Sequence, residues 1–142
     1  MKNLKTMGII ATNKNQNILF YNSNNSIGKQ CLAYTEDSKN DVLTIDVSKT
    51  KVADTQWVEI CDKLNLKLED LVNKEHPNFS NNFDKSTSLS SNDWLKVIQN
   101  NPEVIVTPIL VVGETFYKIE TPSNVRTYLS TTSEGIDEKK HI

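Results

Sequence analysis

The sequence predicts an α/β fold in which one mixed sheet is flanked by helices. Three observations support this fold class. A short apolar run leads through a polar turn into a helical pattern over Asn17–Tyr34, and a β-branched run follows at Val42–Val47. Nearer the C-terminus, the very apolar run Val104–Val112 precedes a hairpin turn and a last helical pattern. A strand-helix-strand half and a strand-strand-helix half therefore share the sheet, with a helical insertion between them.

The first half is organised around Asn17–Tyr34. Its run Ile18–Tyr21 has the length and composition of a buried strand, and Asn22–Asn25 is a cluster of turn formers that can also cap a helix. The helical face is then expected to carry Ile27, Cys31 and Tyr34. A strand that enters a helix through a polar turn gathers N–H groups at the positive helix end, which favours a thiolate or an oxyanion. Val42–Val47 should pair in parallel with the first strand through a right-handed crossover.

The insertion is predicted to be helical at both ends and polar in the middle. Asp54 is expected to cap a helix whose inward face is Trp57, Ile60, Cys61 and Leu64, and a short second helix is expected over Leu66–Val72. Ser90 or Ser91 should cap another helix, with Trp94, Val97 and Ile98 facing inward. Between them, Lys74–Ser91 is interpreted as a long surface connection and His76 as a solvated loop residue.

The second half contains a proline inside its first apolar run. Pro108 forbids an uninterrupted central strand, so we expect a bend at Thr107–Pro108 and a buried strand over Ile109–Val112. Gly113–Glu114 fits a two-residue hairpin turn before a return strand at Thr115–Ile119. A last helix should begin at Thr121-Pro122 and bury Val125, Tyr128 and Leu129. This order of elements is the arrangement of the thioredoxin fold.

Length and charge limit the classes of protein to consider. The 142 residues suit one domain with a proper core, and we divide them into an N-terminal arm (1–16) that could hold an edge strand, a single domain (17–130) and a disordered tail (131–142). The net charge is −2 and there is no basic stripe, so nucleic acid is not expected as a partner. The apolar patch Met7–Ala11 is too short for a signal peptide or a membrane span, so a cytoplasmic protein without membrane association is expected.

The cysteines and histidines suggest no redox or metal chemistry. Cys31 and Cys61 lie thirty positions apart on the apolar faces of two predicted helices, and we interpret them as buried core thiols rather than a redox pair. His76 and His141 are the only histidines, so no metal site is predicted, and we expect no cofactor.

Three segments resemble the ArsC/Spx family, the glutaredoxin-linked arsenate reductases and their relatives. The similarity runs from Asn17 to about Leu129 and rests on Leu19-Phe20-Tyr21-Asn22, on Leu64–Leu71 and on Pro102–Val125 with its two Thr-Pro pairs. The resemblance implies the thioredoxin-like fold. It also implies a cis bond before Pro108, which would lie beside the active site.

The residues that carry the family's chemistry are replaced. The resemblance puts Asn25 at the position of the nucleophilic cysteine, Gly28 at the second redox position and Lys29 where an arginine usually follows. The anion-binding arginines of the family fall on Thr107, on Thr121 and near Val72, and the chain's single arginine is Arg126. The resemblance is therefore one of fold without the reductase mechanism.

We therefore expect a non-catalytic binding or regulatory protein. Its candidate binding residues surround the predicted helix start: Asn22, Asn25, Ser26, Lys29, Thr107 and Pro108. A protein or peptide segment beside Pro108 is the expected partner, because this surface of the thioredoxin fold commonly receives extended peptide.

Two other interpretations stay open at this point. One is a glutaredoxin-dependent arsenate reductase or thiol oxidoreductase that uses Cys31 or a serine at the helix start, Ser23 or Ser26. The other is self-association through the strand Thr115–Ile119 or the N-terminal apolar patch.

Overall fold

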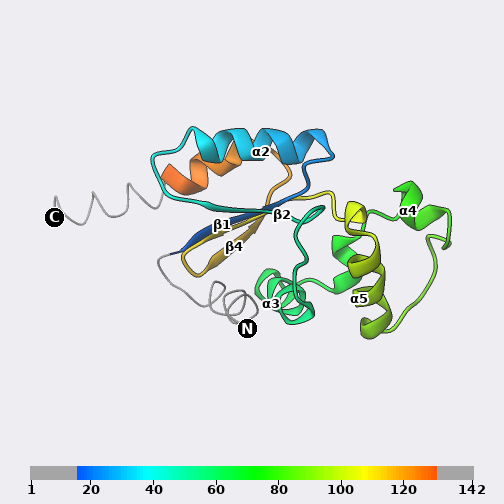
Figure 1. Ribbon diagram of the computed structural model, residues 1–142. Coiled ribbons are helices and arrows are strands. Elements are labelled where there is room, and N and C mark those ends of the chain that lie inside the picture. Colours follow the sequence, from blue (N-terminus) through cyan, green and yellow to red (C-terminus); the bar gives the residue numbers. More distant parts are fainter. Residues whose placement is uncertain (1–15, 131–142) are drawn as a thin grey trace.

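A computed structural model describes residues 16–130 and shows a four-stranded mixed sheet (Figure 1). The strands are β1 (Asn17–Tyr21), β2 (Leu43–Asp46), β3 (Ile109–Val112) and β4 (Thr115–Lys118), in the order β2-β1-β3-β4. β1 pairs in parallel with β2 and antiparallel with β3, and β3 pairs antiparallel with β4. The predicted strand-helix-strand and hairpin halves are confirmed. The arm with its Gly8–Ala11 strand and the tail 131–142 lie outside the described residues.

Helices cover both faces of the sheet. The helices are α2 (Ser26–Glu36), α3 (Asp54–Leu64), the one-turn α4 (Pro77–Ser80) and α5 (Ser91–Asn100), with 3₁₀ turns η1 (Leu68–Leu71) and η2 (Pro102–Val104). Residues 124–130 form a last helix, drawn in orange in Figure 1. In that view α2 and the last helix lie on one side of the sheet, and α3 and α5 lie on the other.

The core is divided by the sheet into two clusters. Ile18 and Phe20 of β1 belong to the cluster around α3 and α5, which we call the α3-side cluster. Leu19, which lies between them in β1, belongs to a second cluster under α2 and the last helix. We call this the α2-side cluster, and it also contains Cys31 and Leu129. β3 alternates in the same way. Since both faces of these strands are buried, the apolar runs are continuous rather than alternating.

The hairpin has the predicted turn. Val112 pairs with Thr115, which leaves Gly113 and Glu114 as the two-residue loop. Gly113 has a φ of 63°, in the left-handed region that a glycine adopts without steric cost.

The polar insertion differs from its prediction at several places. Asp54 is the first residue of α3 rather than its cap, and Ala53 stands at the cap position without a side-chain hydrogen bond. The Asp54 carboxylate instead accepts a hydrogen bond from Gln99 Nε2 at 2.9 Å. The short second helix is the 3₁₀ turn η1. Ser90 does cap α5, as predicted, and accepts a hydrogen bond from the Asp93 N–H.

The segment interpreted as a surface connection contains a buried anchor. Phe79 of α4 is fully buried, and its ring stacks on Phe83 at 5.1 Å and on Trp94 at 5.6 Å. His76 lies in the loop before α4, as predicted, and is partly exposed, but it also has a structural role: its Nδ1 caps α4 and accepts from the Asn78 N–H at 3.1 Å. A single buried aromatic in a polar stretch leaves no periodic pattern, so the sequence gives no helical signal there.

The bond before Pro108 is trans. The resemblance implied a cis bond, but no peptide bond among the described residues is cis. The trans isomer of an X-Pro bond is favoured by about 0.5–1 kcal/mol without tertiary constraint. Here the preceding segment is held through its carbonyls: Ile105 O accepts from Asn22 Nδ2, and Val106 O accepts from Asn25 Nδ2.

Candidate functional site

The candidate site begins with Asn22, directly after β1. Its side chain is only 3% exposed. Its Nδ2 donates to Ile105 O at 3.3 Å, and its Oδ1 accepts from the Asn24 N–H at 2.9 Å. Buried carboxamides need partners for both ends, and this one has them. Asn22 therefore fixes the turn before α2 against the segment that leads to Pro108.

Asn25 is the N-cap of α2 and links the same two segments. Its Oδ1 accepts from the Gly28 N–H at 2.7 Å, and its Nδ2 donates to Val106 O at 3.3 Å. The capping oxygen takes up one of the N–H groups that a helix start otherwise presents. The carboxamide therefore occupies the helix start with an internal bond.

Gly28 lies where α2 touches the turn most closely. A Cβ at this position would stand 2.1 Å from Asn22 O and 2.9 Å from Asn25 Oδ1. The neighbour at 2.1 Å is backbone, so it cannot swing away as a side chain could. A side chain at position 28, including a cysteine, does not fit this arrangement of turn and helix.

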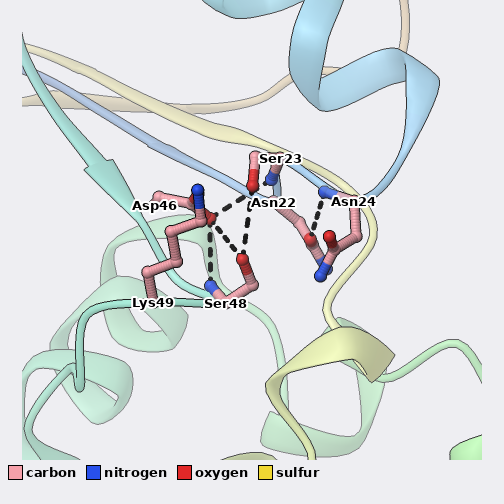
Figure 2. A network of polar contacts seen from close by, with 6 residues as sticks. All are labelled: Asn22, Ser23, Asn24, Asp46, Ser48 and Lys49. Carbon is pink, nitrogen blue, oxygen red and sulfur yellow. Dashed lines mark hydrogen bonds and ion pairs between the residues drawn. The ribbon is translucent and has the colours of Figure 1, made fainter.

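Behind the turn, Asp46 joins the ends of β1 and β2 (Figure 2). Its Oδ1 accepts from the Ser23 N–H at 3.2 Å, the Ser48 N–H at 3.1 Å and the Ser48 hydroxyl at 2.7 Å. Burial acts to raise the pKa of the Asp46 carboxyl, but the hydrogen bonds from Ser23 and Ser48 outweigh it, and the pKa is lowered. Lys49 Nζ lies 4.0 Å from Asp46 Oδ2.

This Asp46 network was missed by the sequence reasoning. A signal was present, because Asp46 lies at the end of one strand and Asn22 directly follows another, and the two strands were expected to be parallel neighbours. The carboxyl ends of adjacent parallel strands meet at one edge of a sheet, so polar side chains there are brought together.

The other predicted binding residues lie around this turn but are not all brought together. Ser26 and Lys29 are exposed on α2, and the Ser26 hydroxyl accepts from Gln30 Nε2 at 2.8 Å. Pro108 is buried, and its carbonyl accepts from the Ile119 N–H at 2.9 Å. Thr107 is half-buried, and its backbone makes no hydrogen bond with another described residue. Among residues 16–130, the Thr107 N–H and C=O beside the start of α2 therefore have no hydrogen-bond partner.

Both cysteines are buried and free. Cys31 is fully buried on the inner face of α2, and Cys61 is 5% exposed on α3. Burial raises the pKa of the Cys31 thiol to about 11, and burial together with Asp70 raises that of Cys61 to about 11. A thiol of this kind is almost entirely protonated at neutral pH, and the thiolate is the reactive form.

The single arginine lies at the opposite end of α2. The Arg126 guanidinium stands 5.8 Å from the centre of the Tyr34 ring. Tyr34 is nine residues beyond Asn25, which corresponds to about 13 Å along a helix. Within residues 16–130, no group of three His, Cys, Asp or Glu side chains gathers as a metal-ligand set. None of the helices described is long and apolar enough to cross a membrane.

Comparison with solved structures shows that this fold is shared with arsenate reductase-related proteins. A putative arsenate reductase from Yersinia pestis and an arsenate reductase from Vibrio cholerae each give a TM-score of 0.65 at 18% identity, over 78% of this chain and 97% and 94% of theirs. An arsenate reductase (ArsC) related protein from Brucella melitensis gives a TM-score of 0.58 at 14% identity, over 80% of this chain and 93% of its own. No family model matches the sequence, and a search of curated proteins finds no match. Identities this low establish the fold alone.

Proposed function

We propose that this chain is an ArsC-related thioredoxin-fold protein that has lost the reductase nucleophile and acts as a binding or regulatory protein. The partner we propose is an extended peptide segment that lies beside Thr107 and Pro108, at the start of α2. The proposal combines the shared fold with the residues present at that place.

The observation that carries the proposal is the position of Asn25. It stands at the N-cap of α2, next to the segment before Pro108, where the resemblance expects a cysteine thiolate. Its Oδ1 binds the Gly28 N–H at 2.7 Å. A carboxamide has no ionisable thiol and cannot form a covalent adduct with arsenate, so the same helix start is used here to hold the fold together.

The surrounding residues support this proposal. The 2.1 Å approach between a Cβ at Gly28 and Asn22 O argues against a second redox cysteine at that position. Cys31 lies six residues beyond Asn25, and a helix end lowers a thiol pKa only within the first turn. Its raised pKa of about 11 makes it a poor nucleophile, which disfavours the alternative of a Cys31-dependent reductase.

The free backbone of Thr107 supports a peptide partner. An extended segment that paired with the Thr107 N–H and C=O would gain main-chain hydrogen bonds as an added strand does. Asn22 and Asn25 hold Ile105 O and Val106 O, and the backbone of the next residue, Thr107, has no partner in the described part of the chain.

The test of the non-catalytic proposal is a combined turnover and thiol assay. Arsenate reduction is measured with glutathione and glutaredoxin, and thiols are titrated with a disulfide reagent at neutral pH. We expect no turnover and two slowly reacting thiols in the native protein. Turnover that is lost in Cys31→Ala and kept in the matched Cys61→Ala would overturn the proposal in favour of the reductase alternative.

The peptide partner is tested separately. Peptides are selected from a displayed random library on the native protein and are then added to ¹⁵N-labelled protein. We expect the amide signals of Thr107 and Ser26 to shift. Shifts confined to Thr115–Lys118 would instead indicate pairing at the β4 edge of the sheet and would contradict a peptide site beside Pro108.

A further inference from the structure

A second concave site adjoins the Asp46 network. A half-open cavity of about 250 Å³ lies between the loop that follows β2 and the C-terminal end of α5. Ser48, which hydrogen-bonds Asp46, forms part of its wall. The cavity is therefore next to the candidate site but opens between different elements.

The base of this cavity is apolar but almost fully buried, and two lysines stand on its rim. Val52, Trp57 and Ile98 line it and are each no more than 2% exposed. Lys49 and Lys51 stand on the rim, and no Asp or Glu is among the lining residues. Five of the eleven lining residues are apolar and six are polar or charged, so the cavity suits a small ligand that carries a charged group.

The two rim lysines are not neutralised equally. The Lys49 side chain is 76% exposed, and its one ion-pair partner among the described residues is Asp46 Oδ2, at 4.0 Å. That carboxylate already accepts hydrogen bonds from Ser23 and Ser48. Lys51 makes no ion pair with any residue of the described part of the chain. The rim therefore keeps net positive charge.

The walls of the cavity are fixed by hydrogen bonds. Gln99 of α5 donates through Nε2 to Val52 O at 2.6 Å and to Asp54 Oδ1 at 2.9 Å, which joins the loop to α5. The Lys49 and Thr50 N–H groups both donate to Asp46 O, at 3.0 Å and 2.8 Å. A cavity built before its ligand arrives loses less ordering entropy on binding.

We propose that this cavity binds a small organic oxyanion, with the anionic group between Lys49 and Lys51 and the apolar body over Trp57. Its volume lies just below the range of about 300–1,000 Å³ that holds drug-sized ligands, so the ligand is small. Both carboxylates and phosphate monoesters have the required chemistry. The site does not depend on the peptide site proposed beside Pro108.

The test is a titration of the full ¹⁵N-labelled chain with benzoate, phenyl phosphate, benzyl alcohol and inorganic phosphate. With at least one of the two organic anions, we expect shifts of the Trp57 indole N–H and of the amides from Ser48 to Val52, while the Trp94 indole stays unmoved. Whichever of benzoate and phenyl phosphate binds more tightly identifies the preferred anionic group. Lys49→Ala/Lys51→Ala should weaken that binding about tenfold, since each exposed charge pair contributes up to about fivefold.

A matched control is Lys63→Ala, an exposed lysine near the other end of α3, which should leave the affinity unchanged. The proposal is wrong if neither organic anion moves the Ser48–Val52 signals. It is also wrong if benzyl alcohol binds as well as the anions, or if inorganic phosphate binds as well as phenyl phosphate. These results are independent of the arsenate and peptide experiments.

Discussion

The two sides of the sheet are built in different ways. Among the described residues, the α3-side cluster holds twenty buried side chains, including both tryptophans of the chain, whereas the α2-side cluster holds seven. All four tyrosines pack on the α2 side and are only partly buried. The α3 side is held by the burial of large apolar groups. The α2 side depends more on close backbone contact and on the polar turn at Asn22–Asn25, which is also where we place the candidate site.

The largest loss of stability is expected from a substitution on the α3 side. Phe79→Ala should lower the free energy of unfolding by about 3–5 kcal/mol, because it leaves a cavity beside Trp94 and Phe83. Urea unfolding followed by tryptophan fluorescence measures this loss. Val58→Ala on α3, which is 47% exposed, is the control and should change stability by no more than about 0.5 kcal/mol. Equal effects of the two changes would mean that α4 is not an anchor of this cluster.

The second largest loss of stability is expected at the contact between α2 and the turn that precedes it. Gly28→Ala should destabilise the protein by about 1–3 kcal/mol, since the new Cβ would meet Asn22 O at 2.1 Å. In an open helix the same change would stabilise by about 1 kcal/mol, so the sign of the result is decisive. Circular dichroism during urea unfolding gives the value. A more stable Gly28→Ala variant would contradict the close approach.

Asp46→Asn should lower the free energy of unfolding by about 1–2 kcal/mol at neutral pH, because it weakens the Asp46 network, and this loss should depend on pH. The folded pKa of Asp46 is lowered, so the stability it adds is present above the ordinary pKa of about 4 and is lost as the pH falls through the folded value. The difference between native and variant protein should therefore shrink below about pH 4. Asp62→Asn, on the exposed face of α3, is the control. A difference that does not change with pH would show that the charge of Asp46 is not involved.

The smallest effect is expected from the tyrosines of the α2 side. Tyr117 and Tyr128 stack with ring centres 3.8 Å apart and planes 10° apart. Tyr117→Leu keeps an apolar side chain but removes the ring stacking. It should lower the free energy of unfolding by about 0.5–1.5 kcal/mol. Thermal unfolding of both proteins measures this. A loss as large as that of Phe79→Ala would remove the proposed contrast between the two sides.

The sequence predicted the sheet and the turn because both leave local patterns. The parallel pair, the Gly113-Glu114 hairpin and the cap at Ser90 all follow from periodicity and turn chemistry. The helix start at Asn25 was predicted in the same way. Phe79 was missed because one buried aromatic in a polar segment has no period. The place of Asp46 at the shared edge of two parallel strands could have been predicted, but its hydrogen bonds with Ser23 and Ser48 could not. The 2.1 Å approach at Gly28 depends on the exact fold of the turn Asn22–Asn25, which local patterns do not specify.

The central claim is that Asn25 fills, with a carboxamide, a helix start that could activate a thiolate. The most direct measurement is the thiol pKa of Asn25→Cys, obtained from the pH dependence of its alkylation in a Cys31→Ala/Cys61→Ala background. We predict a pKa below the ordinary value of about 8.5, because position 25 begins α2. A pKa at or above that value would contradict the account, since position 25 would then not be an inherited nucleophile site.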